Sequence, residues 1–287
     1  MNKIKYFCQF IIILILFFIF RLLGLKYSTK FSGNLMAILG PIFRSNKIII
    51  SNLTKAFPNL SLFEKKTISK KMWFNYGRIF AEYMYIKYFR EKEKFSSLIT
   101  IENRNILEKI KKESKPVIFV SGHFNNFELM AMQIDKAGIN LSAIYRPLNN
   151  IFLNPIMERI RKKYICKKQI KKGVAGTKEL LQNFKNGSSI ALMIDQRVSE
   201  GIMCDFFGQQ ARTTTIPAQF VKKFNVKIVP VYIERFDNNK FKLIFNEFIE
   251  FKGGETLDAI TLQLNKMLEK MILKNPDQWI WTHNRWK

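Results

Sequence analysis

The chain has 287 residues, with 48 Lys or Arg against 22 Asp or Glu and a formal net charge of +26. Hydrophobic residues make up 47% of it and include 27 Phe, which excludes a disordered basic tail, because such tails lack the apolar side chains of a core. The charge favours an anionic partner, either nucleic acid, an acidic protein or lipid headgroups. Three scattered cysteines and two distant histidines argue against a disulfide framework and a histidine-rich metal site.

The first predicted element is an apolar segment from Tyr6 to Leu25, interrupted only by Gln9 and Arg21. As a helix with ~1.5 Å rise per residue it would extend ~30 Å, the thickness of a bilayer's hydrocarbon core. No small-residue cleavage site follows, so we expect an uncleaved membrane anchor over residues 1–25. The alternative is a buried hairpin or core helix, although globular helices of this length seldom carry so continuous an apolar run. The basic body favours the cytoplasmic leaflet.

Residues 26–287 are expected to form a single domain, because no Gly-, Ser- or Pro-rich linker divides them. A helical region with aromatic residues at helical spacing runs from Ser61 to Phe89, and beyond about residue 98 short apolar runs alternate with amphipathic segments. The expected strands are 116–120, 141–145, 190–194, 226–233 and 241–245, and the expected helices are 127–137 and 256–273. This alternation predicts an α/β fold whose sheet is mixed, largely parallel and flanked by helices.

A histidine stands where the first strand of this region ends. His123 follows the apolar run and Gly122, on a turn before a helix, and Glu128 comes five residues later. Ligand sites in open α/β sheets lie at the carboxyl ends of strands, and a histidine there can act as a general base while a carboxylate fixes its tautomer. Alternatively, Asn125 and Glu128 have the spacing of a helix capping box, which would make His123 a turn residue.

The His-x4-Glu pattern is similar to the His-x4-Asp/Glu signature of the glycerolipid acyltransferase superfamily. Further motifs, in their order along the chain, resemble the bacterial lipid A late acyltransferases, which are lauroyl and myristoyl transferases. The matching stretches are 51–53, 56–58, 75–78 with Glu82, 122–128, 145–150, 195–197, 206–208, 216–218 and 279–286.

The resemblance implies a glycerolipid acyltransferase-like fold and transfer of a fatty acyl group from an acyl carrier protein thioester to a hydroxyl of a lipid A precursor. The thioester is a co-substrate, so no cofactor and no metal are expected. The resemblance also implies a place at the cytoplasmic face of a bacterial inner membrane.

Roles for the candidate residues follow from the resemblance together with the residue chemistry. His123 would take the acceptor proton and Glu128 would orient His123; no Gly-x-Ser-x-Gly elbow supports an acyl-enzyme. Arg146 would contact acceptor phosphate or developing charge, unless it is a surface arginine. The predicted substrate-binding set is completed by Asn126, Asp195, Gln196 and Arg197, the last three of which could instead form an ordinary polar loop.

The C-terminal tail interleaves His283 and Arg285 with three tryptophans, a pattern that suits either a membrane interface or a docked segment. Basic runs at 159–163 and 167–172 could receive acyl carrier protein, a phosphorylated lipid acceptor or the anionic leaflet. Two other functions stay open: an acyltransferase with another glycolipid or phospholipid acceptor, and a membrane-tethered nucleic-acid-binding protein. Against the second, the chain carries no nucleic-acid-binding signature, so no nucleic acid is expected as a partner.

Overall fold

The computed structural model describes residues 2–287 and is built around a seven-stranded sheet with the order β1-β9-β8-β2-β5-β3-β4. Its strands are β1 (Ile99–Glu102), β2 (Ile118–Ser121), β3 (Leu141–Tyr145), β4 (Lys168–Lys171), β5 (Ser189–Met193), β8 (Ile228–Asp237) and β9 (Lys240–Phe245). Every neighbouring pair is parallel except β8 and β9, which a tight turn through Asn238 joins as an antiparallel hairpin. The mixed, largely parallel α/β fold predicted from the sequence is therefore confirmed.

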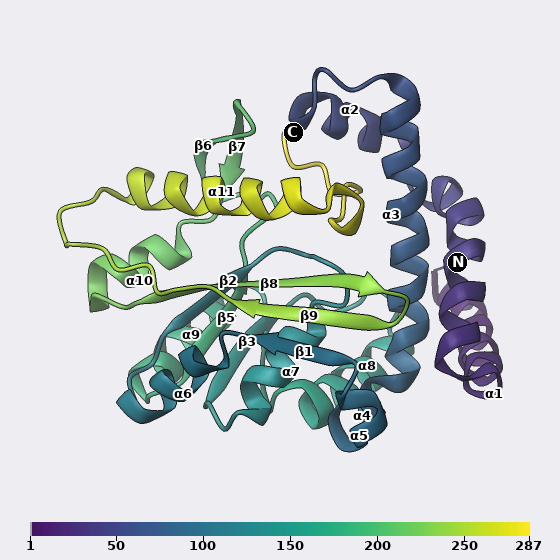
Figure 1. Cartoon of the computed structure of the whole chain (residues 1–287), viewed down its shortest axis with the longest axis horizontal. Helices are drawn as coiled ribbons and strands as arrows, with labels where there is room; N and C mark the ends of the chain where they lie inside the picture. Colours follow the sequence, from purple (N-terminus) through teal and green to yellow (C-terminus); the bar gives the residue numbers. More distant parts are fainter. Residues whose placement is uncertain (1) are drawn as a thin grey trace.

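Helices cover both faces of this sheet. Figure 1 shows α10 (Ile216–Phe224) and α11 (Leu257–Lys274) on one side, with α6 (Arg104–Glu113) and α7 (Glu128–Lys136) on the other. Helix α9 (Val174–Lys185) shares the face of α10, because the rings of Phe184 and Phe220 pack edge to face 5.1 Å apart. A separate two-stranded hairpin, β6 (Ile202–Phe206) and β7 (Gln209–Thr213), lies beside α11.

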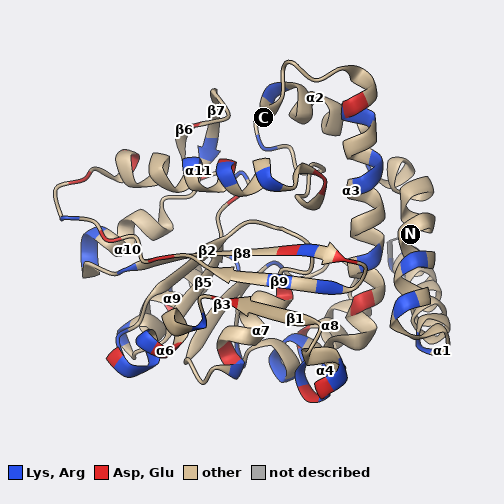
Figure 2. Cartoon of the chain, viewed as in Figure 1, with Lys and Arg blue, Asp and Glu red and all other residues tan. Residues whose placement is uncertain are grey.

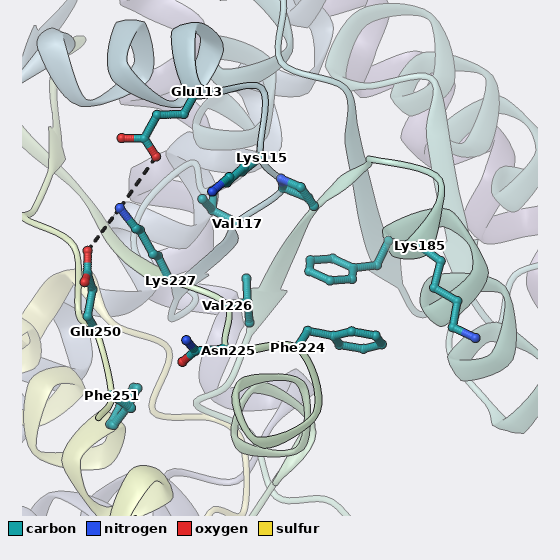
Figure 3. Close-up of a pocket in the computed structure, with 12 residues that line it drawn as sticks. Glu113, Lys115, Val117, Lys185, Phe224, Asn225, Val226, Lys227, Glu250 and Phe251 are labelled. Atoms are coloured by element: carbon teal, nitrogen blue, oxygen red, sulfur yellow. Dashed lines mark ion pairs between the residues drawn. The ribbon is translucent and has the colours of Figure 1, made fainter. Parts of the chain in front are cut away.

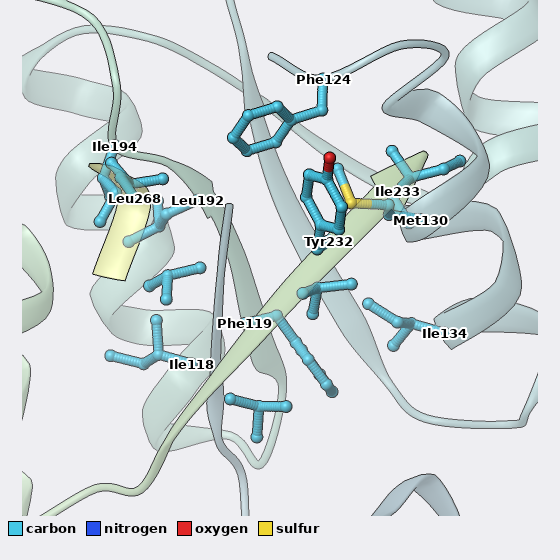
Figure 4. Packing of buried hydrophobic residues seen from close by; sticks show 14 of the residues in the cluster. Ile118, Phe119, Phe124, Met130, Ile134, Leu192, Ile194, Tyr232, Ile233 and Leu268 are labelled. Atoms are coloured by element: carbon cyan, nitrogen blue, oxygen red, sulfur yellow. The ribbon is translucent and has the colours of Figure 1, made fainter. Parts of the chain in front are cut away.

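The centre of the core is β2, whose four residues are all buried. Strands covered on both faces need apolar side chains in both directions, which explains the continuous apolar run from Val117 to Val120. Figure 4 shows Ile118 and Phe119 among side chains from β5, β8, α7 and α11. The core is therefore packed directly beneath the end of the strand from which His123 emerges.

The N-terminal third is helical. It comprises α1 (Asn2–Phe43), α2 (Asn46–Ala56), α3 (Leu62–Glu82), the 3₁₀ turn η1 (Tyr83–Tyr85), α4 (Ile86–Glu91) and α5 (Glu93–Ser96). The predicted helix over 61–89 is thus split at Glu82. A capping box between Ser61 and Glu64 begins α3, and α1 packs along the outer side of α3 (Figure 1). A methyl group at Gly77 would stand 2.2 Å from the carbonyl of Ser32, so this close approach requires glycine.

The first helix runs well past the predicted boundary at residue 25. It bends at Gly24, whose φ of +71° interrupts the helical geometry, and continues to Phe43. Within the described residues it is the one helix long and apolar enough to cross a membrane: its most apolar window has a mean hydropathy of 2.6 and is only 11% buried. That low burial excludes the alternative of a core helix.

The C-terminal tail is docked on the body. Trp281 and Arg285 are fully buried, and Arg285 donates to the Thr213 hydroxyl at 2.7 Å while its guanidinium lies over the ring of Phe206. The indole N–H of Trp286 donates to the Phe206 carbonyl at 3.1 Å. Of the two interpretations left open for the tail, the docked segment is correct.

Candidate active site

Strands β2 and β5 are parallel neighbours, so the residues that follow them meet at one edge of the sheet. His123 stands two residues beyond β2, and Asp195 stands two residues beyond β5. Gly122 makes the approach possible, because a methyl group there would lie 3.1 Å from Asp195 Oδ2 and 2.9 Å from the Phe124 ring.

Asp195 holds His123 at two points. The ring Nδ1 of His123 is 2.8 Å from Asp195 Oδ1, and the backbone N–H of His123 donates to Asp195 Oδ2 at 2.7 Å. The indole N–H of Trp279 donates to the same Oδ2, also at 2.7 Å. The Asp195 side chain is fully buried, whereas 22% of the His123 side chain is exposed. The imidazole is therefore fixed from the protein side and reachable from outside.

Charge and burial oppose each other in this pair. Burial alone would lower the pKa of His123, but the negative charge of Asp195 and its hydrogen bond outweigh it and raise the pKa above 6.5. Burial would likewise raise the pKa of Asp195, yet the charge of His123, its ring and backbone hydrogen bonds and the hydrogen bond from Trp279 lower that pKa to about 2. Asp195 is thus a carboxylate at neutral pH, which sets Nδ1 as the protonated nitrogen and leaves Nε2 as the basic one.

Glu128, which we predicted would orient His123, has other partners. Its Oε1 accepts hydrogen bonds from the Tyr83 hydroxyl and from Arg161 Nε, the latter at 2.8 Å, and Arg161 also forms an ion pair with it at 2.7 Å. Both charged side chains are nearly buried, at 8% and 12% exposure. Glu128 influences His123 only electrostatically. Its negative charge helps to raise the pKa of His123, but this effect is smaller than that of Asp195.

The capping-box alternative is wrong. Helix α7 begins at Glu128, its N-cap is Phe127, and no side chain caps it. Asn125 has a left-handed backbone with φ of +41°, and its side-chain amide donates to Gln278. Glu128 points instead to Arg161, which lies in the π-helical turn η2 (Arg161–Ile165) after α8 (Leu153–Ile160).

The remaining four predicted residues differ in their surroundings. Gln196 lies beside the imidazole, its amide nitrogen 3.4 Å from Nδ1 and 3.5 Å from Nε2 of His123. Arg197 follows it, with a buried Nε that has no hydrogen-bond partner among the described residues. Arg146 is exposed and follows β3, which pairs with β5 and ends at the same edge. Asn126 is fully buried and donates to Glu82 Oε2 at 3.1 Å, a structural partner in place of the predicted substrate contact.

A buried ion pair supports the site from behind. Arg235 of β8 donates to both carboxylate oxygens of Glu82 on α3, at 2.6 and 3.1 Å. Because the Arg235 side chain is only 4% exposed, it does not face the substrate. Asn75 and Asn126 complete the network through hydrogen bonds at 3.3 and 3.1 Å. Glu82, the last residue of α3 and the one before Tyr83, is thus joined to β8 through Arg235 and to the loop after β2 through Asn126.

A cavity of about 600 Å³ lies at the opposite edge of the sheet. Its lining includes Val117, which precedes β2, so the cavity and His123 lie at opposite ends of the same strand. Lys227 stands in it between Glu113 and Glu250, at 3.5 and 3.1 Å (Figure 3). Within the described residues this cavity takes no part in the His123 site.

Tyr83, Arg161 and Trp279 contact predicted site residues but were not themselves predicted as part of the histidine site. Arg161 lies in a run of five residues with four cations, and Tyr83 belongs to a stripe of core aromatics, so neither stood out by type. Asp195 was assigned to substrate binding; its position directly after a predicted strand was a signal that it lies at the same edge of the sheet as His123, but not that it contacts the imidazole.

The α/β fold, with a histidine held by a buried carboxylate at the carboxyl ends of β2 and β5, defines the class of the protein as an α/β enzyme. Comparison with known proteins gives its family. The model of the bacterial lipid A biosynthesis acyltransferase family matches residues 1–287. The chain belongs to this family and is an acyltransferase of lipid A biosynthesis.

Three curated relatives are similar over most of the chain. The lipid A biosynthesis acyltransferase 2 of Shigella flexneri is 23% identical over 80% of this chain and 74% of its own length. The lipid A biosynthesis palmitoleoyltransferase and lauroyltransferase of Escherichia coli K12 are 21% and 22% identical, each over 85% of this chain and 79% of their own lengths. Among solved structures, the 1-acyl-sn-glycerophosphate acyltransferase of Thermotoga maritima covers 86% of this chain and 98% of its own, with 15% identity and a TM-score of 0.42.

Proposed function

We propose that this protein transfers a fatty acyl group from an acyl carrier protein thioester to a hydroxyl group of a lipid A precursor. The reaction takes place at the cytoplasmic face of the bacterial inner membrane, where the acceptor and the anionic leaflet meet the basic body of the protein. The observation that carries this proposal is the 2.8 Å contact between His123 Nδ1 and Asp195 Oδ1, in a chain of an acyltransferase family.

In this reaction His123 is the general base. Its Nε2 takes the proton of the acceptor hydroxyl while the hydroxyl oxygen attacks the thioester carbonyl. The tetrahedral intermediate then expels the thiolate as the carbon–sulfur bond breaks, and the imidazolium returns the proton to the thiolate. Asp195 holds the ring in the productive tautomer and stabilises the imidazolium, as a buried carboxylate does in other histidine-based acyl transfers. No acyl-enzyme forms.

Two polar side chains that follow β5 can donate hydrogen bonds to the negative charge that develops on the carbonyl oxygen. Gln196 adjoins the ring, and the buried Nε of Arg197 has a free N–H donor among the described residues. Donors of this kind, when preorganised, are typically worth about 10²–10³ in rate. Arg146, exposed at the same edge, is suited to a phosphate group of the acceptor.

Glu128 acts in this proposal through Arg161. Burial would lower the pKa of Arg161, but Glu128 outweighs this effect and raises it, so the guanidinium stays charged beside the site. Glu128 is then a positioning residue for Arg161, and Asp195 is the residue that orients His123.

The experiment is acyl transfer by the full-length protein in phospholipid vesicles, followed by mass spectrometry of the acceptor. We expect a lipid A precursor to gain the mass of one acyl chain from acyl carrier protein, and His123→Ala to slow this gain by about 10²–10⁴-fold. Transfer from coenzyme A alone would contradict the proposed donor. Transfer only to a glycerophospholipid or another glycolipid would contradict the proposed acceptor.

A further inference from the structure

We propose that the first half of α1 lies in the plane of the membrane interface, docked on the catalytic body, and does not cross the bilayer. The partner is a phospholipid surface with anionic headgroups. This inference deepens the membrane attachment within the proposed function, and it does not depend on the chemistry at His123.

The first half of α1 contacts the body along one side. We call this side the docked row; it runs from Tyr6 through Phe10 and Phe17 to Phe20. At its beginning, the Asn150 side-chain amide donates to the carbonyl of Tyr6 at 2.8 Å, and the ring of Phe152 packs against that of Phe10 at 6.0 Å. These contacts tie α1 to the loop between β3 and α8.

The same row reaches the N-terminal helices at its other end. Phe17 and Phe20 are buried with Ala81 in a small apolar cluster, and the Tyr85 hydroxyl donates to the carbonyl of Phe20 at 2.5 Å. From Tyr6 to Phe20 the docked row therefore extends ~21 Å at ~1.5 Å per residue.

A helix docked in this way cannot cross the hydrocarbon core alone. If α1 crossed the membrane, its two docking places, the loop after β3 and the end of α3, would lie at depths in the bilayer that differ by ~21 Å. The charged residues next to these places would then enter the hydrocarbon core. Those charges include exposed Arg146 and the side chains of Lys87 and Glu91, of which 53% and 42% are exposed. Each cation at the bilayer centre costs at least about 2.5–3.5 kcal/mol. Lying parallel to the surface avoids that cost.

The face opposite the docked row is apolar and uncovered. On a helical wheel with about 100° per residue, Ile4, Ile11, Ile15 and Leu22 lie opposite the docked row, and they are 73%, 39%, 54% and 71% exposed. Phe18 on the same face is 64% exposed. An uncovered apolar face of this length indicates burial in a medium other than water.

The cations of this segment stand at the borders of that face. Lys3 and Arg21 lie on one border and Lys5 on the other, each about 75–90° from the docked row on the same wheel. Figure 2 shows α1 with few charged residues along its length. Apolar side chains on the outer face with cations beside them suit a helix that sinks about 5–10 Å into the headgroup boundary while its cations reach anionic phosphates.

This arrangement brings the lipid phase to the active site. The ring of Tyr83 packs against the cluster of Phe17 and Phe20, and its hydroxyl contacts Glu128 and Arg161. One side chain therefore separates the docked helix from the ion pair beside His123, and an acceptor could reach the base without leaving the interface.

The test determines on which side of the membrane each end of the helix lies. Cys8 is exposed on α1, while Cys166 and Cys204 are buried, so in a Cys8→Ser background each variant of the full chain carries one accessible cysteine. Lys3→Cys reports the start of α1, Phe18→Cys its outer face, and Ser199→Cys an exposed loop of the body. Each is treated with a membrane-impermeant maleimide in spheroplasts and in inverted inner-membrane vesicles.

We expect Lys3→Cys and Ser199→Cys to react from the same side, and Phe18→Cys to react from neither side until detergent is added. Reaction of Lys3→Cys from the side opposite to Ser199→Cys would show a spanning helix and overturn the inference. Aqueous reaction of Phe18→Cys in intact membranes would overturn it as well. A spanning result would leave the proposed acyl transfer intact, since the activity of each preparation is measured separately.

Ile15→Cys in the Cys8→Ser background gives a second, independent measurement. Residue 15 lies on the outer face near the middle of the docked segment, so it would reach the bilayer centre only in a spanning helix. A fluorophore on this cysteine should be quenched by quenchers attached near the lipid headgroups in both kinds of vesicle. Quenching strongest at the bilayer centre, or none at all, would contradict an interfacial helix.

Discussion

Two carboxylates stand near His123, and the contrast between them shows how a site at a sheet edge is built. Asp195 is 72 residues away in sequence but follows the strand next to β2, and it contacts the imidazole at 2.8 Å. Glu128 is five residues away, yet it begins a helix that carries it to Tyr83 and Arg161. The ends of neighbouring parallel strands, and not the spacing along the chain, decide which acid meets the base.

Removing the base should have the largest effect. His123→Ala should lower kcat/KM for acyl transfer by about 10²–10⁴-fold, the usual contribution of a positioned general base. His283→Ala is the matched control, because burial lowers the pKa of His283 to about 4 and we assign it no part in the reaction. Equal losses in the two variants would remove His123 from the mechanism.

Neutralising Asp195 should have the next largest effect. Asp195→Asn should lower kcat/KM by about 10²-fold or more, because the wrong tautomer of His123 becomes accessible. In the wild type, activity should rise with pH through the pKa of His123, which lies above 6.5. Asp195→Asn removes the charge that raises this pKa and keeps the burial that lowers it, so the acid limb of the rate profile should move to lower pH. An unmoved limb would contradict the role of Asp195.

Neutralising Glu128 should have a smaller effect, about tenfold on kcat/KM, which corresponds to one pKa unit of interaction. If Glu128 acts by positioning Arg161, the double variant Glu128→Gln/Arg161→Met should lose no more rate than the worse single variant. Losses that multiply would indicate independent roles. A loss for Glu128→Gln larger than that for Asp195→Asn would reverse the comparison.

Breaking the pair behind the site should affect the chemistry least and stability most. Glu82→Gln leaves the buried Arg235 guanidinium without its counter-charge, which typically costs about 3–5 kcal/mol of unfolding free energy. Thermal unfolding in detergent measures it, with Glu91→Gln as the control because the pair of Glu91 with Lys87 is exposed and worth about 0–1 kcal/mol. Equal stability of the two variants would show that the buried pair does not hold α3 to β8.

The sequence predicted most of the central sheet, because periodicity reports burial. The runs at 141–145 and 190–194 agree with β3 and β5 to within one residue, since strands buried on both faces must be apolar throughout. The edge strands β1 and β4 and the hairpin of β6 and β7 were missed. β4 begins at Lys168 and ends at Lys171, and Ile170 is the one buried residue in it, so no apolar run marks this strand.

The site was predicted only in part, because periodicity reports which residues are buried but not which strands are neighbours. His123 and the segment 195–197 were recognised at strand ends, but their pairing depends on β5 lying next to β2, which alternating periodicity does not reveal. The partners of Glu128 come from η1 and η2, and the buried Asn126 donates to Glu82 of α3. Contacts of this kind arise from helix packing across long sequence separations, where residue type gives no signal.

The most direct test is the titration of the two imidazoles by NMR in the full-length protein labelled with ¹³C-histidine. The chain has only His123 and His283, so a His283→Asn variant assigns both signals. We expect the pKa of His123 to lie above 6.5, to fall markedly in Asp195→Asn and to fall much less in Glu128→Gln. A larger fall in Glu128→Gln, or no change in Asp195→Asn, would contradict the assignment of Asp195 as the acid that holds the base.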